Sequence, residues 1–210
     1  MPDASRWRPL ALLGLIGLGA AVTLGGIDEL TRSTIDDQRR AYALRAVSAI
    51  LAGRNHDNDL LDSARPIDID GLEATTVYTA RLDGQPVAAV FDVTTPRGYS
   101  GDIRLLVAVD DGGDVLGVRV LEHRETPGLG DRIESGRSDW LEQFEGKSLG
   151  NPSRDRWAPD RRDGAFDTVT SATITSSAVI DAVKRVLATF ESHRNRVFAE
   201  SGPANANGPD

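Results

Sequence analysis

The sequence predicts an α+β protein with one N-terminal transmembrane helix, followed by a domain in which an antiparallel sheet packs with helices. Three observations support this fold class. An uncharged apolar run lies near the N-terminus, and four segments in the middle of the chain are rich in Val, Ile and Leu and separated by turn signals. The last long segment has apolar residues at the three- and four-residue spacing of a helix.

The composition is that of a globular protein and excludes several functions. The chain has 210 residues, 40% of them hydrophobic and 27% charged, which suits one ordinary domain with attachments. Its net charge of −8 argues against nucleic-acid binding, which requires a basic face. Because cysteine is absent, the chain supplies no thiolate to a metal or cluster and forms no disulfide. No motif of hydrolytic or nucleotide-driven chemistry occurs, so we expect no catalytic residue and no metal site.

Residues 10–27 form the predicted transmembrane helix. They carry no charge, and as a helix they span about 27 Å, close to the roughly 30 Å of a hydrocarbon core. Arg6 and Arg8 precede the run, and positive flanks stay in the cytoplasm, so residues 1–9 are expected there and the remainder on the outer side. A cleaved signal peptide is the alternative, but no clean Ala-x-Ala site precedes a polar stretch.

Residues 28–58 are expected to form a membrane-proximal helix and its linker. Apolar residues between positions 43 and 51 recur at helical spacing, and a turn-like Gly-Arg-Asn-His segment ends the helix. The extracytoplasmic domain is expected over residues 59–195, beginning with an irregular stretch. Residues 201–210 lack large apolar side chains, so residues 196–210 are expected to be a disordered tail.

Four strands are expected in the domain, over residues 75–82, 85–93, 103–109 and 115–122. Asp83-Gly84 is a strong two-residue hairpin signal between the first pair. Asp111-Gly-Gly113 has the same role between the last pair, and a longer connection rich in Gly and Pro links the two hairpins. Together these signals predict an antiparallel meander.

Two helices are expected after the sheet. The first is short and covers residues 138–144, with Ser138 as its cap and Trp140, Leu141 and Phe144 turned inward. A polar, loop-like stretch follows it. The final helix buries an apolar stripe formed by Val179, Val183, Val186, Leu187 and Phe190.

A hydroxyl-rich block opens the final helix. Six Ser and Thr side chains lie within residues 167–176. A helix N-terminus has unpaired N–H groups and the positive end of the helix dipole, so this position suits a phosphate. Ser and Thr also gather at helix starts as ordinary N-caps, and the residues alone leave both interpretations open.

The block resembles the flavinylation motif of the Rnf and Na⁺-translocating NADH:quinone reductase families, Asp-x-x-Ser/Thr-Gly-Ala-Thr-x-Thr/Ser. Asp167, Thr170, Ala172 and Thr173 are in register with it, and Ser171 stands where the pattern usually has Gly. The resemblance implies that Thr173 carries FMN through a phosphoester bond. It also implies that Asp167 is recognised by a flavin transferase, which uses FAD and Mg²⁺.

Further motifs in the same order extend the resemblance to the G subunit of the Rnf (Rsx) electron transport complex over residues 1–195. They lie at residues 98–103, 122–131 and 138–140. The resemblance implies two sets of flavin contacts, each with an ordinary turn or cap as its alternative. Those near the phosphate are Thr170, Ser171, Ala172, Thr175 and Ser176, and those beside the isoalloxazine ring are Tyr99, Glu125, Thr126, Pro127, Gly128 and Leu129. His123 lies nearby, but it is better explained as a satisfied strand-end residue.

The resemblance implies an electron carrier with covalent FMN and no catalytic turnover of its own, within an Rnf-type complex that links ferredoxin and NAD⁺ to ion movement. Its expected partners are the other membrane and peripheral subunits, the flavin transferase during maturation and inner-membrane lipid. We expect a single-pass protein of the bacterial inner membrane, with its main domain in the periplasm. Two alternatives remain open: a flavin carrier like the C subunit of a Na⁺-translocating NADH:quinone reductase, and a non-redox anchored scaffold whose hydroxyl block is only a cap.

Overall fold

The computed structural model describes residues 13–15, 17, 45–51 and 53–199. Two units are distinguished by their internal contacts, residues 1–45 and residues 46–210, and the sheet and its helices belong to the second. Residues 13–15 and 17 are helical, but the rest of the predicted transmembrane run lies outside the described residues. No helix in the described part of the chain is long and apolar enough to cross a bilayer.

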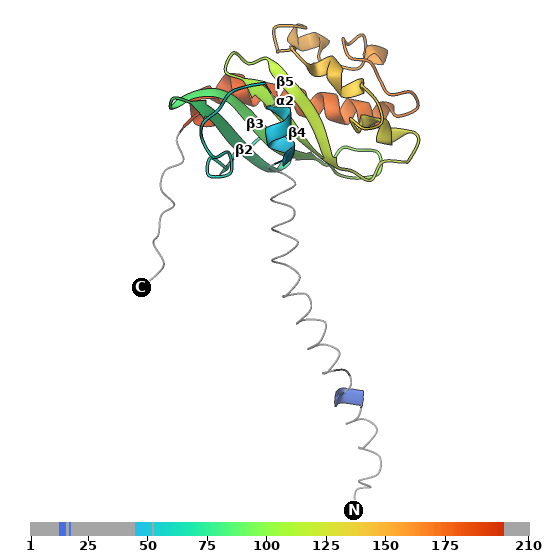
Figure 1. The fold of residues 1–210 in the computed structure, drawn as a ribbon. Helices are drawn as coiled ribbons and strands as arrows, with labels where there is room; N and C mark the ends of the chain where they lie inside the picture. Colours follow the sequence, from blue (N-terminus) through green and yellow to red (C-terminus); the bar gives the residue numbers. More distant parts are fainter. Residues whose placement is uncertain (1–12, 16, 18–44, 52, 200–210) are drawn as a thin grey trace, which may run out of the picture. The chain divides into compact units, whose positions relative to one another are not determined.

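A five-stranded antiparallel sheet in the order β1-β2-β3-β4-β5 forms the centre of the described domain (Figure 1). The meander predicted from the sequence is therefore confirmed, and its four long strands end within two residues of the expected positions. The strands are β1 Arg65–Pro66, β2 Glu73–Leu82, β3 Gln85–Thr95, β4 Ile103–Asp110 and β5 Val115–Glu122. Strand β1 was not predicted, because two residues, one of them proline, carry no alternating pattern.

Tight turns set the register of the two hairpins. Asp83 and Gly84 both have positive φ, 51° and 76°, which is the signature of the type I′ turn that matches strand twist. This turn pairs Leu82 directly with Gln85. At the other hairpin, one carboxylate oxygen of Asp110 accepts the N–H groups of Gly113 and Asp114, each at 2.9 Å.

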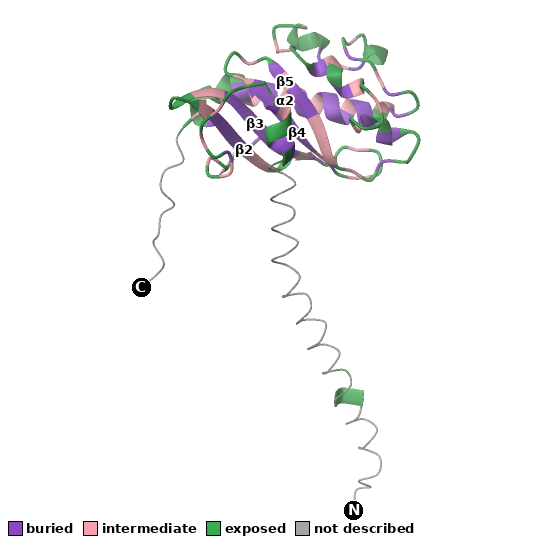
Figure 2. Cartoon of the chain, in the orientation of Figure 1, coloured by how far each residue is buried: buried purple, intermediate pink, exposed green. Residues whose placement is uncertain are grey.

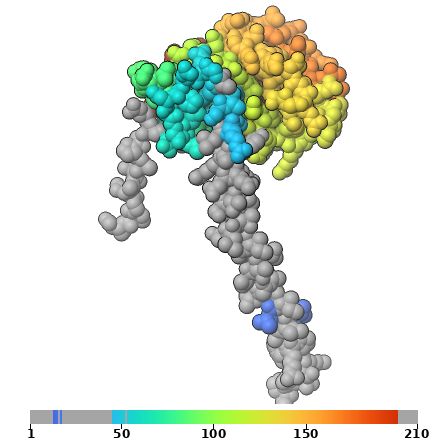
Figure 3. All heavy atoms as spheres, in the orientation of Figure 1, coloured from blue at the N-terminus to red at the C-terminus, as the bar shows by residue number. Residues whose placement is uncertain are grey.

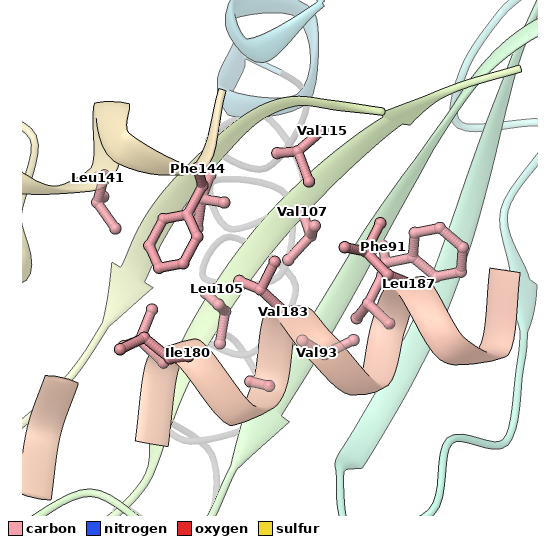
Figure 4. Close-up of a cluster of buried hydrophobic side chains, with 14 of the residues drawn as sticks. Phe91, Val93, Leu105, Val107, Val115, Leu141, Phe144, Ile180, Val183 and Leu187 are labelled. Atoms are coloured by element: carbon pink, nitrogen blue, oxygen red, sulfur yellow. The ribbon is translucent and has the colours of Figure 1, made fainter. Parts of the chain in front are cut away.

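One face of the sheet packs against α2, which spans Thr173–Val197. Because side chains alternate along a strand, one set from β3 and β4 points toward this helix. These strand residues meet the apolar stripe of α2, as Figure 4 shows for Phe91, Val93, Leu105, Val107, Ile180, Val183 and Leu187. Burying a side chain of this size contributes about 1.5–3 kcal/mol, so this interface is the main support of the C-terminal helix. The predicted stripe of α2 is fully buried.

The opposite face of the sheet carries a smaller apolar cluster, covered by the helical segment at residues 45–50. Ala46, Val47 and Leu51 pack there against strand residues that include Val90 and Leu106. Figure 2 shows buried residues on the central strands and on α2. The central strands are therefore covered on both faces, and residues 46–51 belong to the same folded unit as the sheet.

Four short 3-10 helices lie between β5 and α2 in the described chain. They are η1 Gly130–Ile133, η2 Trp140–Phe144, η3 Arg154–Arg156 and η4 Asp160–Arg162. Helix η2 is the predicted short helix, although its N-cap residue is Asp139 rather than Ser138. Leu141 and Phe144 are buried as expected, whereas Trp140 is only partly buried. In the space-filling view this connecting segment, yellow to orange, covers one side of the domain (Figure 3).

The C-terminal end of α2 extends into the stretch expected to be a tail. Val197 is helical and fully buried, and residues 200–210 lie outside the described chain. The last carbonyl groups of the helix bind side chains of the sheet: Thr79 donates to Val197 O at 3.2 Å, and Arg81 to Phe198 O at 2.6 Å. A helix C-terminus leaves carbonyls unpaired, so these donors explain why the ordered structure continues past residue 195.

Candidate functional site

The hydroxyl-rich block forms the turn that leads into α2. Thr173 is the first residue of the helix, Ala172 occupies the N-cap position, and no side chain caps the first N–H groups. The first turn also lacks an acidic residue. The junction therefore lacks the ordinary side-chain cap that was the alternative interpretation of this block. An uncapped N-terminus of a 25-residue helix favours an anion.

Two hydroxyl groups of the block are buried and already bonded. Thr175 is 1% exposed and donates to Glu125 Oε2 at 2.5 Å. Ser176 Oγ accepts the N–H of Val169 at 2.9 Å and donates to Ala172 O at 3.0 Å. Both residues were predicted to contact the cofactor. In the structure, the hydroxyl of Thr175 binds the loop after β5, and that of Ser176 binds the turn before α2.

Thr173 has a different environment from these two residues. Its side chain is half-buried, and its hydroxyl group forms no hydrogen bond with the described residues. Thr170 and Ser171, which precede it, are exposed. Ser171 has a φ of 67°, the left-handed conformation that glycine adopts most easily. The position where the motif usually has Gly therefore has a backbone that favours Gly.

A cavity of about 410 Å³ lies at this junction, within the size range of small-molecule sites. Three segments far apart in the sequence form it: the loop after β3, the loop after β5 and the start of α2. Its lining residues are Tyr99, Glu125, Thr126, Leu129, Gly130, Ser171, Ala172, Thr173, Ile174 and Thr175.

Most of the predicted contact residues lie on this lining, but four do not. Those four are Thr170, Pro127, Gly128 and Ser176. Gly130 and Ile174 line the cavity and were not predicted as contacts. Ile174 could have been found from the sequence, because it is an apolar residue outside the buried stripe of an amphipathic helix.

Large apolar side chains are exposed around this cavity. Tyr99, Leu129 and Ile174 are 68%, 44% and 54% exposed. They come from the three different segments that form the lining. Exposed apolar groups that converge on one cavity are characteristic of ligand sites and contact surfaces. The cavity therefore has an apolar rim that suits a planar aromatic ligand, and a helix N-terminus that suits a phosphate.

The buried carboxylate of Glu125 connects the three segments that form the cavity. Its carboxylate accepts the hydroxyl of Thr175 and, at 3.0 Å, the N–H of Ser100. Glycines allow this close approach: a Cβ at Gly98 would lie 2.7 Å from Glu125 Oε1, and one at Gly130 would lie 2.8 Å from Glu125 Cβ. Both distances are shorter than real Cβ contacts allow, so a larger residue at either position would require the loop or the Glu125 side chain to shift.

His123 lies behind the Glu125 loop and does not line the cavity. Its Nδ1 accepts the N–H of Glu125 at 3.0 Å, so in the neutral ring Nε2 carries the proton. Nε2 is 2.8 Å from Glu134 Oε1, to which it donates. Both ring nitrogens are therefore used to fix the loop, as expected for a satisfied strand-end histidine.

Asp167 is held through its backbone and presents its carboxylate to solvent. Gln143 Oε1 accepts its N–H at 2.8 Å, and the indole N–H of Trp140 donates to its carbonyl at 2.7 Å. Its carboxylate forms no hydrogen bond with the described part of the chain. It borders a second cavity of about 490 Å³, which Trp140 and Gln143 also line. Thr173 is not on that lining, so the two residues face different cavities.

Comparisons with known proteins cover the region that forms this cavity. A family model for the FMN-binding domain matches residues 98–188, which include every residue that lines the first cavity. Among solved structures, the crystal structure of Shewanella oneidensis NqrC is similar, with a TM-score of 0.48 and 24% identity, over 66% of this chain and 70% of that one.

Close relatives extend over nearly the whole chain. The G subunit of the ion-translocating oxidoreductase complex of Pseudomonas aeruginosa (strain UCBPP-PA14) is 41% identical over 199 residues, which cover 93% of each chain. The protein of the same name from Cereibacter sphaeroides is 40% identical over 192 residues, which cover 91% of this chain and 87% of that one. This protein therefore belongs to the family of G subunits of ion-translocating oxidoreductase complexes.

Proposed function

We propose that this protein is the flavin electron carrier of a membrane-bound, Rnf-type ion-translocating ferredoxin:NAD⁺ oxidoreductase complex, with FMN attached covalently to Thr173 through its phosphate. The main support is the position of Thr173. It is the first residue of an uncapped helix, and it lines a cavity inside the region that matches FMN-binding domains.

The choice of Thr173 over its neighbours follows from the hydrogen bonds. Thr175 is buried and has already donated its hydroxyl proton to Glu125, and Ser176 is bonded on both sides. A phosphoester at either position would break these buried hydrogen bonds. Thr173 is half-buried and its hydroxyl has no partner in the described chain, so, unlike those of Thr175 and Ser176, this hydroxyl can accept a phosphoryl group without breaking a bond.

The phosphate would be stabilised where Thr173 places it. A phosphoester retains one negative charge, and the N–H groups at the start of α2 lie beside the Thr173 side chain. Ser171 lines the same cavity and can donate its hydroxyl to a phosphate oxygen. Bound FMN supplies the redox chemistry, while Tyr99 and Leu129 offer apolar surface to its ring system.

The exposed rim of the cavity suits a site that relays electrons rather than a site that converts a substrate. Tyr99, Leu129 and Ile174 all keep large exposed fractions. A covalent bond retains the cofactor without an enclosing pocket, so the ring can stay close enough to the surface to exchange electrons with other subunits. The relatives are named as components of a complex, which supports the other components of that complex as partners.

Maturation and membrane attachment complete the proposal. Residues 10–27 would anchor the chain in the bacterial inner membrane, with residues 1–9 in the cytoplasm and the domain in the periplasm. A flavin transferase would recognise Asp167, whose carboxylate is exposed and whose backbone is held by Gln143 and Trp140.

The test is flavin fluorescence of the denatured protein. The full chain is coexpressed with a flavin transferase, and wild type, Thr173→Val and Thr175→Val are compared on denaturing gels and by intact mass. We expect a fluorescent band and one added FMN moiety in the wild type and in Thr175→Val, and neither in Thr173→Val. A dark wild-type band contradicts covalent attachment, and fluorescence lost only in Thr175→Val shows that the acceptor is the other hydroxyl.

A further inference from the structure

The wall of the flavin cavity contains a buried carboxylate without a cationic partner. Glu125 is 5% exposed and lines the cavity. Its two hydrogen-bond donors, the N–H of Ser100 and the hydroxyl of Thr175, are both neutral. No Arg, Lys or His within residues 45–51 and 53–199 forms an ion pair with it.

The neighbouring acidic groups differ from Glu125 in this respect. Asp131 is also buried, but its Oδ2 lies 3.4 Å from the guanidinium of Arg137. Glu122 pairs with Arg104 at 3.2 Å, and its side chain is 63% exposed, so water and salt screen its charge. Of these three acids, Glu125 alone combines burial, an unpaired charge and a place on the cavity wall.

We infer that Glu125 sets the reduction potential of the flavin in this cavity, and that its charge lowers that potential. The inference rests on the proposed function, because it concerns FMN bound at the same site. Adding an electron next to a fixed negative charge is unfavourable. For a charge within about 10 Å at an effective dielectric constant of about 20, the one-electron equilibrium changes roughly tenfold.

The surroundings of Glu125 keep this charge in place. Ser100 and Thr175 bind its two oxygens from the loop after β3 and from the first turn of α2. These two bonds hold the carboxylate in the cavity wall, where solvent and salt screen a charge less than at the surface.

The experiment is a potentiometric titration of the flavinylated full chain in three forms: wild type, Glu125→Gln and Glu122→Gln. Glutamine has nearly the same shape as glutamate. Its amide oxygen can accept the N–H of Ser100, and its amide nitrogen can donate to the Thr175 hydroxyl, so the fold is retained. Glu122→Gln is the matched control, because it removes an equal charge from an exposed position of the same chain segment.

We expect Glu125→Gln to favour one-electron reduction about tenfold, which is an upward shift of about 59 mV. This shift should persist from low to high salt, because a buried charge is poorly screened. Glu122→Gln should shift the equilibrium by less than about twofold, and that shift should vanish in salt.

Three results would overturn the inference: an unchanged or lowered potential in Glu125→Gln, a shift that disappears in salt, or a folded Glu125→Gln protein that acquires no flavin while the wild type does. The last result would assign Glu125 to cofactor attachment instead. Failure of the proposed function is distinguishable, because it appears as a wild-type protein without covalent flavin, before any potential is measured.

Discussion

Ser171 adopts a backbone conformation that its side chain disfavours, so Ser171→Gly should stabilise the domain. Its φ is 67°, where crowding between Cβ and the backbone costs an L-residue about 1–2 kcal/mol. Glycine avoids that cost but loses about 0.5–1 kcal/mol more conformational entropy on folding. The difference predicts a gain of about 0.5–1 kcal/mol, or roughly 1–4 °C in Tm for a domain of about 150 residues.

Urea and thermal unfolding of the full chain, followed by circular dichroism, would measure this gain. Ser171→Ala is the matched control: it removes the hydroxyl but keeps the Cβ, so it should give no gain. The reasoning is refuted if the Gly variant is no more stable than wild type, or if Ala stabilises as much as Gly. Because Gly adopts the same backbone without steric strain, Ser171→Gly should also accept flavin at least as fast as wild type in a coupled transferase assay.

Three further substitutions test the packing and the hydrogen bonds of the domain. Arg104→Met removes the guanidinium that binds both carboxylate oxygens of buried Asp92, at 2.9 and 2.7 Å. It should lower the free energy of unfolding in urea by about 3 kcal/mol. A loss below about 1 kcal/mol would show that Asp92 finds another partner. Thr175→Val removes the buried donor to Glu125 and should lower the unfolding free energy by about 1–3 kcal/mol while the denatured protein remains fluorescent. Leu187→Ala empties part of the interface between α2 and the sheet and should cost about 2–5 kcal/mol in the same assay, whereas truncation of exposed Leu82 should cost under about 1 kcal/mol.

The turns and the buried helix face of the fold could be predicted from local sequence patterns. Asp83-Gly84 specifies its turn through residues that tolerate positive φ, and the stripe of α2 follows from helical spacing alone. Strand β1 was missed because its pairing with β2 depends on a tertiary contact. The domain was expected to end at residue 195, but α2 continues to Val197, because Thr79 and Arg81 on a distant strand bind the carbonyl groups of Val197 and Phe198.

The motifs of the candidate site could be identified from the sequence, but the contacts between its residues could not. The sequence placed Thr173 and Glu125 near a common ligand through their resemblance to known motifs. It could not show that Thr175 donates its hydroxyl proton to Glu125, because these residues are 50 positions apart. Apart from the motif, nothing in the sequence distinguishes the six hydroxyls of the block. Only the folded chain separates the bonded hydroxyls of Thr175 and Ser176 from that of Thr173.

The bond between Glu125 and Thr175 has a consequence for the order of biosynthetic events. Contacts between residues so distant in sequence form late, because the intervening loop must first be closed. A nascent or misfolded chain contains the modification motif but lacks the folded cavity around it. If the transferase recognises the folded cavity as well as the motif, it attaches flavin only to chains whose last helix has docked on the sheet. The yellow colour of the mature protein then reports correct folding.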